Sequence, residues 1–237
     1  MYGWRGRIGV VVPADNSVTE IDFHRLAPVG VSAHALRLPR LPREDMGAHA
    51  VTMVGDLLYS RFDVLTYMCA ASSFLLGVDG NVALQRSLAA AIGDKPVSTT
   101  STVMVDALRA IGAQRVSVIA PYRAPIVEAL CAFLEASDVE VGAVRGLGLD
   151  AVDINETGPE AVYQAVRAAE RRGCDAILVP ATNLRALDVI EACEADFGLP
   201  MVTSNQASYW WALQALGVHG SIEGFGSLLR DHVDATP

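Results

Sequence analysis

Residues 7–13 read RIGVVVP, and 108 residues further along the chain residues 115–121 read RVSVIAP. Two more segments recur in the same order: FDVLTYMCAAS at residues 62–72 matches CDAILVPATN at residues 174–183, and KPVST at residues 95–99 matches LPMVT at residues 199–203. These offsets are much longer than the period of a solenoid repeat, which is about 20–50 residues. We therefore expect two related halves that face each other around one cleft.

Apolar, β-branched runs alternate with Ala- and Leu-rich amphipathic stretches along the chain, which is typical of parallel strands joined by helices. The runs predict strands at residues 7–12, 32–38, 64–68, 97–98, 115–120, 140–146, 176–179 and 201–203. The amphipathic stretches predict helices at residues 17–26, 48–60, 82–92, 101–111, 125–136, 159–172, 184–197 and 208–216. Loops are expected around residues 39–43 and 146–158, and the tail after Gly220 is glycine-rich. The sequence thus predicts an α/β protein with two parallel sheets.

The lobe boundaries follow from where the chain should cross between the halves, near Ser101 and Asn205. We assign residues 1–98 and 205–237 to the first lobe and residues 99–204 to the second. No low-complexity linker separates the halves, so we expect a tight interface between them.

Composition excludes several classes of function. The hydrophobic fraction of 51% argues against disorder, and the formal net charge of -9 argues against a nucleic-acid partner, which would require a basic face. The longest uncharged run, residues 64–78, is too short to span a membrane, and no secretory leader is apparent. We expect a cytoplasmic protein without nucleic-acid or membrane partners, and a homo-oligomer is left open.

The widely spaced cysteines indicate free thiols: Cys69, Cys131, Cys174 and Cys193.

Ligands of parallel α/β sheets bind beyond the carboxyl ends of the strands. The chain places amides, hydroxyls, one thiol and few charges there: PADNS at residues 13–17, CAASS at 69–73, PYR at 121–123, ATN at 181–183 and SNQ at 204–206. Such a set suits a small carboxylate, which helix N-termini can hold without an arginine. The same donors would stabilise an enolate beside that carboxylate. No GxGxxG motif follows the first strand, and the histidines lack ligand-like spacing, so neither a dinucleotide nor a metal is expected.

Cys69 is the main candidate for chemistry, because it follows the third strand at the start of a helix. A helix dipole lowers the pKa of a thiol there, so we expect a pKa well below about 8.5. The alternative is a small buried residue that packs under a loop.

Tyr122 is either a hydrogen-bond donor to substrate or a half-buried loop residue, and Asn16 and Asn183 are either site residues or helix caps.

The strand-end motifs resemble those of a known family. VPADNSVTE at residues 12–20 resembles the first loop of maleate cis-trans isomerases, ATNLR at 181–185 is similar to their Cys-Thr-Asn-Leu-Arg motif, and SNQA at 204–207 to their Ser-Asn-Gln-Ala segment. Met68-Cys69 and Pro121-Tyr122 are similar to segments of the related arylmalonate decarboxylases. Both belong to the aspartate/glutamate racemase superfamily, and the resemblance extends to about Gly217.

This resemblance implies two pseudo-symmetric Rossmann-like lobes, an active site in the cleft between them, and neither a cofactor nor a metal. In the isomerases one cysteine attacks the double bond of maleate and the other serves as acid. By resemblance, Cys69 is the catalytic nucleophile. The residues assigned to substrate binding are Pro13, Asn16, Ala70, Tyr122, Asn155, Ala181, Thr182 and Asn183.

The chain departs from the family pattern at Ala181, which stands where the second cysteine is expected. Alanine neither donates nor accepts a proton, which argues against two-base racemisation. We therefore expect a cofactor-independent isomerase of a small unsaturated dicarboxylate that works with one thiolate. Two alternatives stay open: a decarboxylase- or racemase-like enzyme acting on another carboxylate, and a catalytically impaired carboxylate-binding accessory protein of the ectoine-utilisation type.

Overall fold

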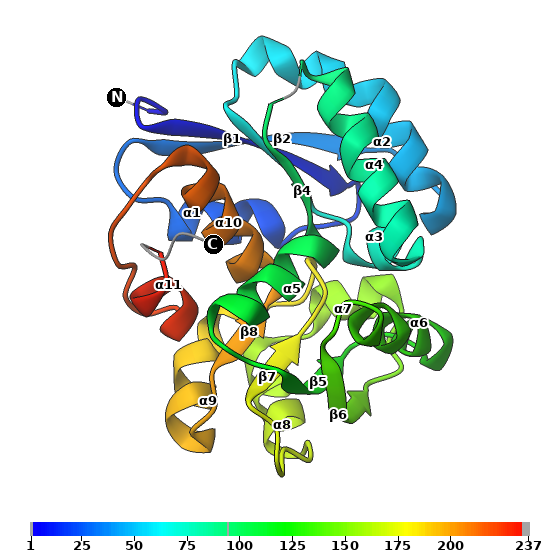
Figure 1. Ribbon diagram of the computed structural model, residues 1–237, viewed down its shortest axis with the longest axis vertical. Helices are drawn as coiled ribbons and strands as arrows, with labels where there is room; N and C mark the ends of the chain where they lie inside the picture. The colour runs from blue at the N-terminus through cyan, green and yellow to red at the C-terminus, as the bar shows by residue number, and fades with distance from the viewer. Residues whose placement is uncertain (1, 94, 234–237) are drawn as a thin grey trace.

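The computed structural model describes residues 2–93 and 95–233 and contains two four-stranded parallel sheets (Figure 1). The first sheet has the strand order β2-β1-β3-β4 and the second has the equivalent order β6-β5-β7-β8. The strands are β1 (Gly6–Pro13), β2 (Val31–Leu38), β3 (Val64–Tyr67), β4 (Val97–Thr99), β5 (Arg115–Ala120), β6 (Glu140–Gly146), β7 (Ala176–Val179) and β8 (Met201–Thr203). Every predicted strand is confirmed, and the repeat in the sequence is a repeat in sheet topology.

Helices connect the strands and flank both sheets (Figure 1). The expected helices are α1 (Thr19–Leu26), α2 (Arg43–Leu57), α4 (Gly77–Ala91), α5 (Thr100–Ala110), α6 (Ala124–Glu135), α8 (Pro159–Arg167), α9 (Ile190–Phe197) and α10 (Ser204–Leu216). The 3-10 turns η1 (Leu58–Ser60) and η2 (Leu187–Val189) extend α2 and precede α9. The short helix α3 (Ala70–Phe74) is the helix expected to begin at Cys69. Two further short helices were not predicted: α7 (Ala151–Glu156), which lies in the expected loop at residues 146–158, and α11 (Ser227–Asp231).

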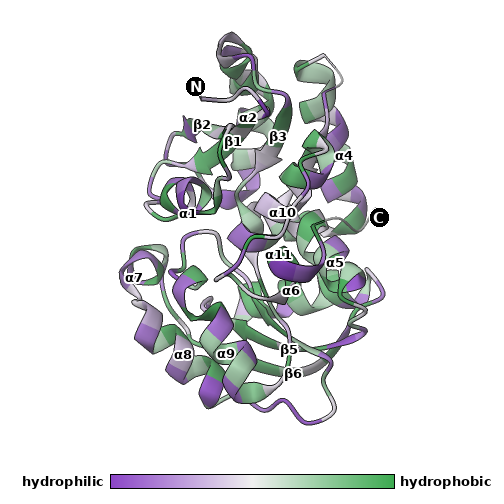
Figure 2. Ribbon diagram, turned by 90° about the vertical axis from the view of Figure 1, so that its left-hand side faces the viewer, coloured by the Kyte–Doolittle hydropathy of each residue, from purple (hydrophilic) through white to green (hydrophobic). Residues whose placement is uncertain are grey.

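The local sequence explains where these helices begin and which face they bury. In α8 the buried side chains Val162, Ala165 and Val166 recur at helical spacing, and Figure 2 shows hydrophilic and hydrophobic residues sharing this helix. α10 begins at Ser204, earlier than predicted, because Thr203 and Gln206 form a reciprocal capping box.

The two halves share a core. α5 follows the last strand of the first sheet, α10 follows the last strand of the second, and the two helices pack against each other between the sheets (Figure 1). One cluster of buried apolar residues extends from β1 to β8, and a second lies under α2 and α4. The proposed boundaries of the lobes stay a prediction, and residues 1, 94 and 234–237 lie outside the described chain.

The carboxyl ends of the two sheets lie against each other. The hydroxyl of Thr182, just beyond β7, donates a hydrogen bond to the carbonyl oxygen of Met68, just beyond β3, at 3.1 Å. The loops that follow equivalent strands are therefore in direct contact, as the repeat predicts. In the part of the chain that is described, no helix is long and apolar enough to cross a membrane.

Candidate active site

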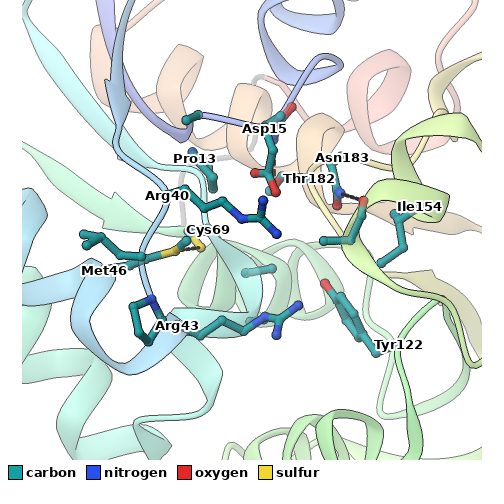
Figure 3. A pocket seen from close by; sticks show the side chains of 17 residues that line it. Pro13, Asp15, Arg40, Arg43, Met46, Cys69, Tyr122, Ile154, Thr182 and Asn183 are labelled. Atoms are coloured by element: carbon teal, nitrogen blue, oxygen red, sulfur yellow. Dashed lines mark hydrogen bonds between the residues drawn. The ribbon is translucent and has the colours of Figure 1, made fainter.

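A cavity of about 250 Å³ lies where the strand ends of the two sheets meet (Figure 3). It is lined by the loops that follow β1, β2, β3, β5 and β7, together with residues of α2, α3 and α7. The predicted site residues that line it are Pro13, Asn16, Cys69, Ala70, Tyr122, Thr182 and Asn183. The fold therefore brings most of the predicted set to one small cavity between the sheets.

Cys69 is the N-cap residue of α3 and is only 6% exposed. Its thiol donates a hydrogen bond to the sulfur of Met46, a residue of α2, at 3.3 Å (Figure 3). Burial raises the pKa of the Cys69 thiol, and hydrogen bonding with Ser72 and the positive charge of Arg43 oppose this rise only in part. The expected low pKa is therefore wrong: α3 is short, and packing over the sulfur outweighs the helix dipole. The thiol is therefore neutral near pH 7.

A set of buried hydroxyl groups fixes the backbone around Cys69. The Tyr67 and Ser72 hydroxyls lie 2.6 Å apart, and Ser72 Oγ donates to the Cys69 carbonyl oxygen at 3.1 Å. Thr100 Oγ1, on the adjoining α5, donates to the carbonyl of Tyr67 at 2.9 Å. These contacts hold the turn between β3 and α3, and with it the position of the sulfur.

Tyr122 points its hydroxyl into the cavity from the second half of the molecule (Figure 3). Its ring packs edge-on against Phe74 with centroids 5.9 Å apart, and the residue is 5% exposed. Burial raises the pKa of Tyr122 well above its ordinary value. The phenol therefore stays protonated and is a hydrogen-bond donor at every pH of interest.

Asn16 and Thr182 form the wall between the two halves. Asn16 Oδ1 accepts hydrogen bonds from the backbone N–H groups of Val18 and Thr19 at 3.0 Å, so it pairs two N–H groups at the start of α1, although the N-cap position itself is Val18. Asn16 Nδ2 donates to Thr182 Oγ1 at 3.1 Å and to Thr19 Oγ1 at 2.9 Å. The side chains of Asn16 and Thr182 are thus hydrogen-bonded to each other and to neighbouring groups. A contact of either residue with a substrate stays a prediction.

Asn155 and Ala181 do not line the cavity, in contrast to the prediction. The unpredicted helix α7 directs Asn155 toward the loop after β1, where Nδ2 donates to the Asp15 carbonyl at 2.9 Å and Oδ1 accepts from the Ser17 N–H at 3.4 Å. Ala181 is 4% exposed, adopts a φ of 98°, and donates its N–H to Ser204 Oγ at 3.0 Å. Both residues support the walls of the cavity.

The prediction missed Arg40 and Arg43, whose guanidinium groups project into the cavity (Figure 3). Neither forms a hydrogen bond or ion pair with another residue of the described chain, and Asp15 is the acidic side chain that lines the same cavity. The expected scarcity of charge at the site is therefore wrong. Both arginines follow β2 at the same sheet edge as the predicted loops, so inspection of that strand end would have identified them. Met46, on the following helix, was missed for the same reason.

Within residues 2–93 and 95–233, no group of three or more His, Cys, Asp or Glu side chains is placed to hold a metal ion. The groups that are available for chemistry are one thiol, one phenol, two guanidinium groups and the N-terminal turn of α3. Such an arrangement can bind an anion, add sulfur to an electrophilic carbon and stabilise the negative charge that results.

The chain is similar to known proteins over nearly its whole length. A family model described as arylmalonate decarboxylase matches residues 8–229. The arylmalonate decarboxylase of Bordetella bronchiseptica is 31% identical over 232 residues, covering 94% of this chain and 96% of that protein. The maleate isomerase of Nocardia farcinica is 28% identical over 243 residues, covering 94% of this chain and 95% of that protein.

A solved structure adds chemical detail from a relative. It is a cysteine-to-serine mutant of the Nocardia farcinica maleate cis-trans isomerase with a covalently bound succinylcysteine intermediate. That structure is 26% identical to this chain, with a TM-score of 0.90 over 95% of this chain and 98% of the other. The likeness includes both sheets and the strand ends between them.

Proposed function

Because the chain belongs to the arylmalonate decarboxylase family, we propose that it isomerises a small unsaturated dicarboxylate such as maleate, with Cys69 as nucleophile and without a cofactor. The observation that carries this proposal is that Cys69 shares one small cavity with Tyr122, Arg40 and Arg43. The maleate isomerases among the relatives, and the succinylcysteine intermediate of the Nocardia farcinica protein, support this choice of reaction.

The reaction needs no second acid. The Cys69 thiolate adds to one alkene carbon, a sulfur–carbon bond forms, and the π electron pair moves onto the neighbouring carbon and its carboxylate as an enediolate. The former double bond is now a single bond and rotates. The electron pair then returns, the sulfur–carbon bond breaks, and the trans alkene leaves with the thiolate restored. No proton is gained or lost by the substrate, which is compatible with Ala181 in place of a second cysteine.

The cavity supplies groups that stabilise the enediolate. The protonated Tyr122 phenol and the Arg43 guanidinium project into it, and Ala70 and Ala71 line it from the first turn of α3. Donors fixed in advance at the place where charge develops are worth about 10²–10³-fold in rate each. Because burial raises the pKa of the Cys69 thiol, this thiol must first give up its proton to solvent before the thiolate attacks.

The test is to incubate the protein with maleate and to follow fumarate by proton NMR. We expect fumarate to appear without added metal or nucleotide. A second substrate, phenylmalonate, is offered in parallel and analysed for released carbon dioxide. If the protein converts neither maleate nor phenylmalonate, the proposal that it is an enzyme is wrong, and the alternative of a carboxylate-binding accessory protein is favoured.

Single-thiol decarboxylation is the second candidate, and one observation favours it. Burial keeps the Cys69 thiol protonated, and a protonated thiol can deliver a proton to the enediolate that remains after an arylmalonate loses carbon dioxide. The arylmalonate decarboxylase of Bordetella bronchiseptica is also among the relatives. Release of carbon dioxide from phenylmalonate, without fumarate from maleate, would select this candidate.

Replacing Arg43 with Gln is expected to raise the KM for maleate about tenfold, which is about 1.4 kcal/mol. Arg43 is half-buried, lines the cavity and has no ion-pair partner in the described chain, so its charge is available to a second carboxylate. Initial rates over a range of maleate concentrations measure the effect.

The matched control is Arg86→Gln. Arg86 is exposed on α4 and does not line the cavity, so the variant changes net charge equally while leaving KM within about twofold. Equal KM values for the two variants would show that Arg43 does not contact the substrate.

A further inference from the structure

Asp22 is a buried carboxylate close to the cavity that the proposed reaction does not use. It lies in α1, is 4% exposed, and is the one Asp, Glu, Lys or Arg among the buried residues of the described chain. Asn205 Nδ2, on α10, donates a hydrogen bond to Asp22 Oδ2 at 2.7 Å. A buried charge is costly unless it is paired and hydrogen-bonded, so its presence here calls for a function.

Asp22 is connected to the cavity through two hydrogen bonds. Asn205 Nδ2 donates both to Asp22 and to the carbonyl oxygen of Thr182 at 3.0 Å. Thr19 Oγ1 is the second donor to that carbonyl, also at 3.0 Å. Thr182 lines the cavity, and its own hydroxyl donates to the carbonyl of Met68, the residue before Cys69. The network thus joins α1 and α10 to the loops that carry the site.

The ionisation of Asp22 falls close to neutral pH. Burial raises the pKa of Asp22 to about 6, the Asn205 hydrogen bond and the charge of Arg25 lower it, and the charge of Asp188 raises it. Arg25 and Asp188 form an ion pair that joins α1 to η2. On β2, which also packs on α1, the titratable or charged groups are His34 and Arg37, and Arg37 pairs with Glu20. On α10 the titratable group is Tyr209, whose pKa is raised by burial, so its hydroxyl stays protonated. Asp22 is therefore ionised at pH 7 and neutral well below pH 6.

We propose that Asp22 is a positioning residue whose ionised carboxylate orients the Asn205 amide and thereby holds the Thr182–Asn183 turn in the shape that binds a substrate carboxylate. A hydrogen bond to a charged acceptor is roughly twice as strong as one between neutral groups. Loss of the charge frees the Asn205 amide to rotate and leaves the Thr182 carbonyl with Thr19 as its donor. This inference rests on the proposed function in one respect, namely that a carboxylate binds beside Thr182.

Electrostatics alone makes the opposite prediction. Removing a buried negative charge near the cavity raises the local potential, which would strengthen the binding of an anion. A weakening of carboxylate binding on loss of the Asp22 charge therefore identifies positioning through Asn205, and a strengthening identifies a simple field effect.

The experiment compares the alkylation of Cys69 by iodoacetate, a small carboxylate, with its alkylation by the neutral iodoacetamide. Peptide mass spectrometry measures both rate constants in the intact protein, and their ratio is divided by the same ratio for glutathione. The thiolate fraction of Cys69 cancels in this ratio, so the normalised value reports only the preference of the cavity for a carboxylate. The readout does not depend on turnover.

In the wild type we expect a normalised ratio above one at pH 7.5 that falls as the pH decreases, with a midpoint near the Asp22 pKa of about 6. In Asp22→Asn we expect a ratio about tenfold lower at pH 7.5 and no midpoint between pH 5.5 and 7.5. Asp106→Asn is the matched control: burial also raises the pKa of Asp106, but this residue lies on α5 and pairs with Arg109, outside the network. Its ratio should equal that of the wild type.

Three outcomes would overturn the inference. These are an unchanged ratio in Asp22→Asn, an increased ratio in that variant, and a wild-type ratio that does not vary with pH. The wild-type profile decides the question even if the variant fails to fold. A wild-type ratio equal to that of glutathione would show that the cavity has no preference for a carboxylate. That result would contradict both the proposed function and the inference.

Discussion

Replacement of Cys69 by serine is expected to lower kcat for maleate isomerisation by about 10⁴-fold or more. The addition and the elimination both require a group that attacks and leaves as an anion, and a hydroxyl is far less acidic than a thiol, whose ordinary pKa is about 8.5. Cys69 is the cysteine that lines the cavity. Fumarate formation measures the loss, and intact mass spectrometry of acid-quenched wild type detects the covalent adduct.

The control for this variant is Cys131→Ser. Cys131 is a half-buried free thiol on α6 that does not line the cavity, so kcat should stay within about twofold of the wild type. If Cys69→Ser folds and retains more than about a tenth of the wild-type kcat, the thiol is not the nucleophile and the proposed reaction has to be abandoned.

Replacement of Ala181 by cysteine is expected to raise kcat for maleate about 10²-fold, the lower end of the range for an added general acid. A second thiol beside Thr182, which lines the cavity, would donate a proton to the enediolate carbon and give a succinyl thioether. On elimination the new thiolate would take that proton back while the bond between carbon and the Cys69 sulfur breaks. Ala181 already holds a φ of 98°, so a cysteine there introduces no new backbone conformation. Steady-state rates of fumarate formation and the amount of trapped adduct measure the gain.

Ala181→Ser is the matched control, because it adds an atom of similar size that is not an acid near neutral pH. Its kcat should be within about threefold of the wild type. A folded Ala181→Cys protein with unchanged kcat would show that the missing acid is not what limits the reaction, and would favour turnover through the single thiolate alone.

The strands could be predicted from the sequence because β1, β3, β5 and β7 are short apolar runs that are buried on both faces. Apolar periodicity did not reveal α3, α7 and α11, since each has only five or six residues and no periodic pattern can develop over so short a stretch. The error at Asn155 follows from this, because its direction is set by α7.

The composition of the cavity was only partly predictable. Residues after β1, β3, β5 and β7 were found because parallel strands end at one edge of a sheet. Arg40, in the proline-rich segment after β2, and Arg43, the first residue of α2, were overlooked. The ionisation of Cys69 and Asp22 depends on packing of α2 and α10, which no local pattern contains. The sequence can therefore identify a candidate residue, but it cannot predict a pKa that is set by burial in the folded protein.

The equivalent strand orders of the two sheets have an evolutionary consequence. A pocket formed by two identical subunits about a twofold axis must present the same side chain from both, so every substitution occurs twice. When the two copies are fused into one polypeptide, each is free to diverge independently. The thiol of one half and the methyl group of the other, Cys69 and Ala181, are a difference that two identical subunits could not maintain.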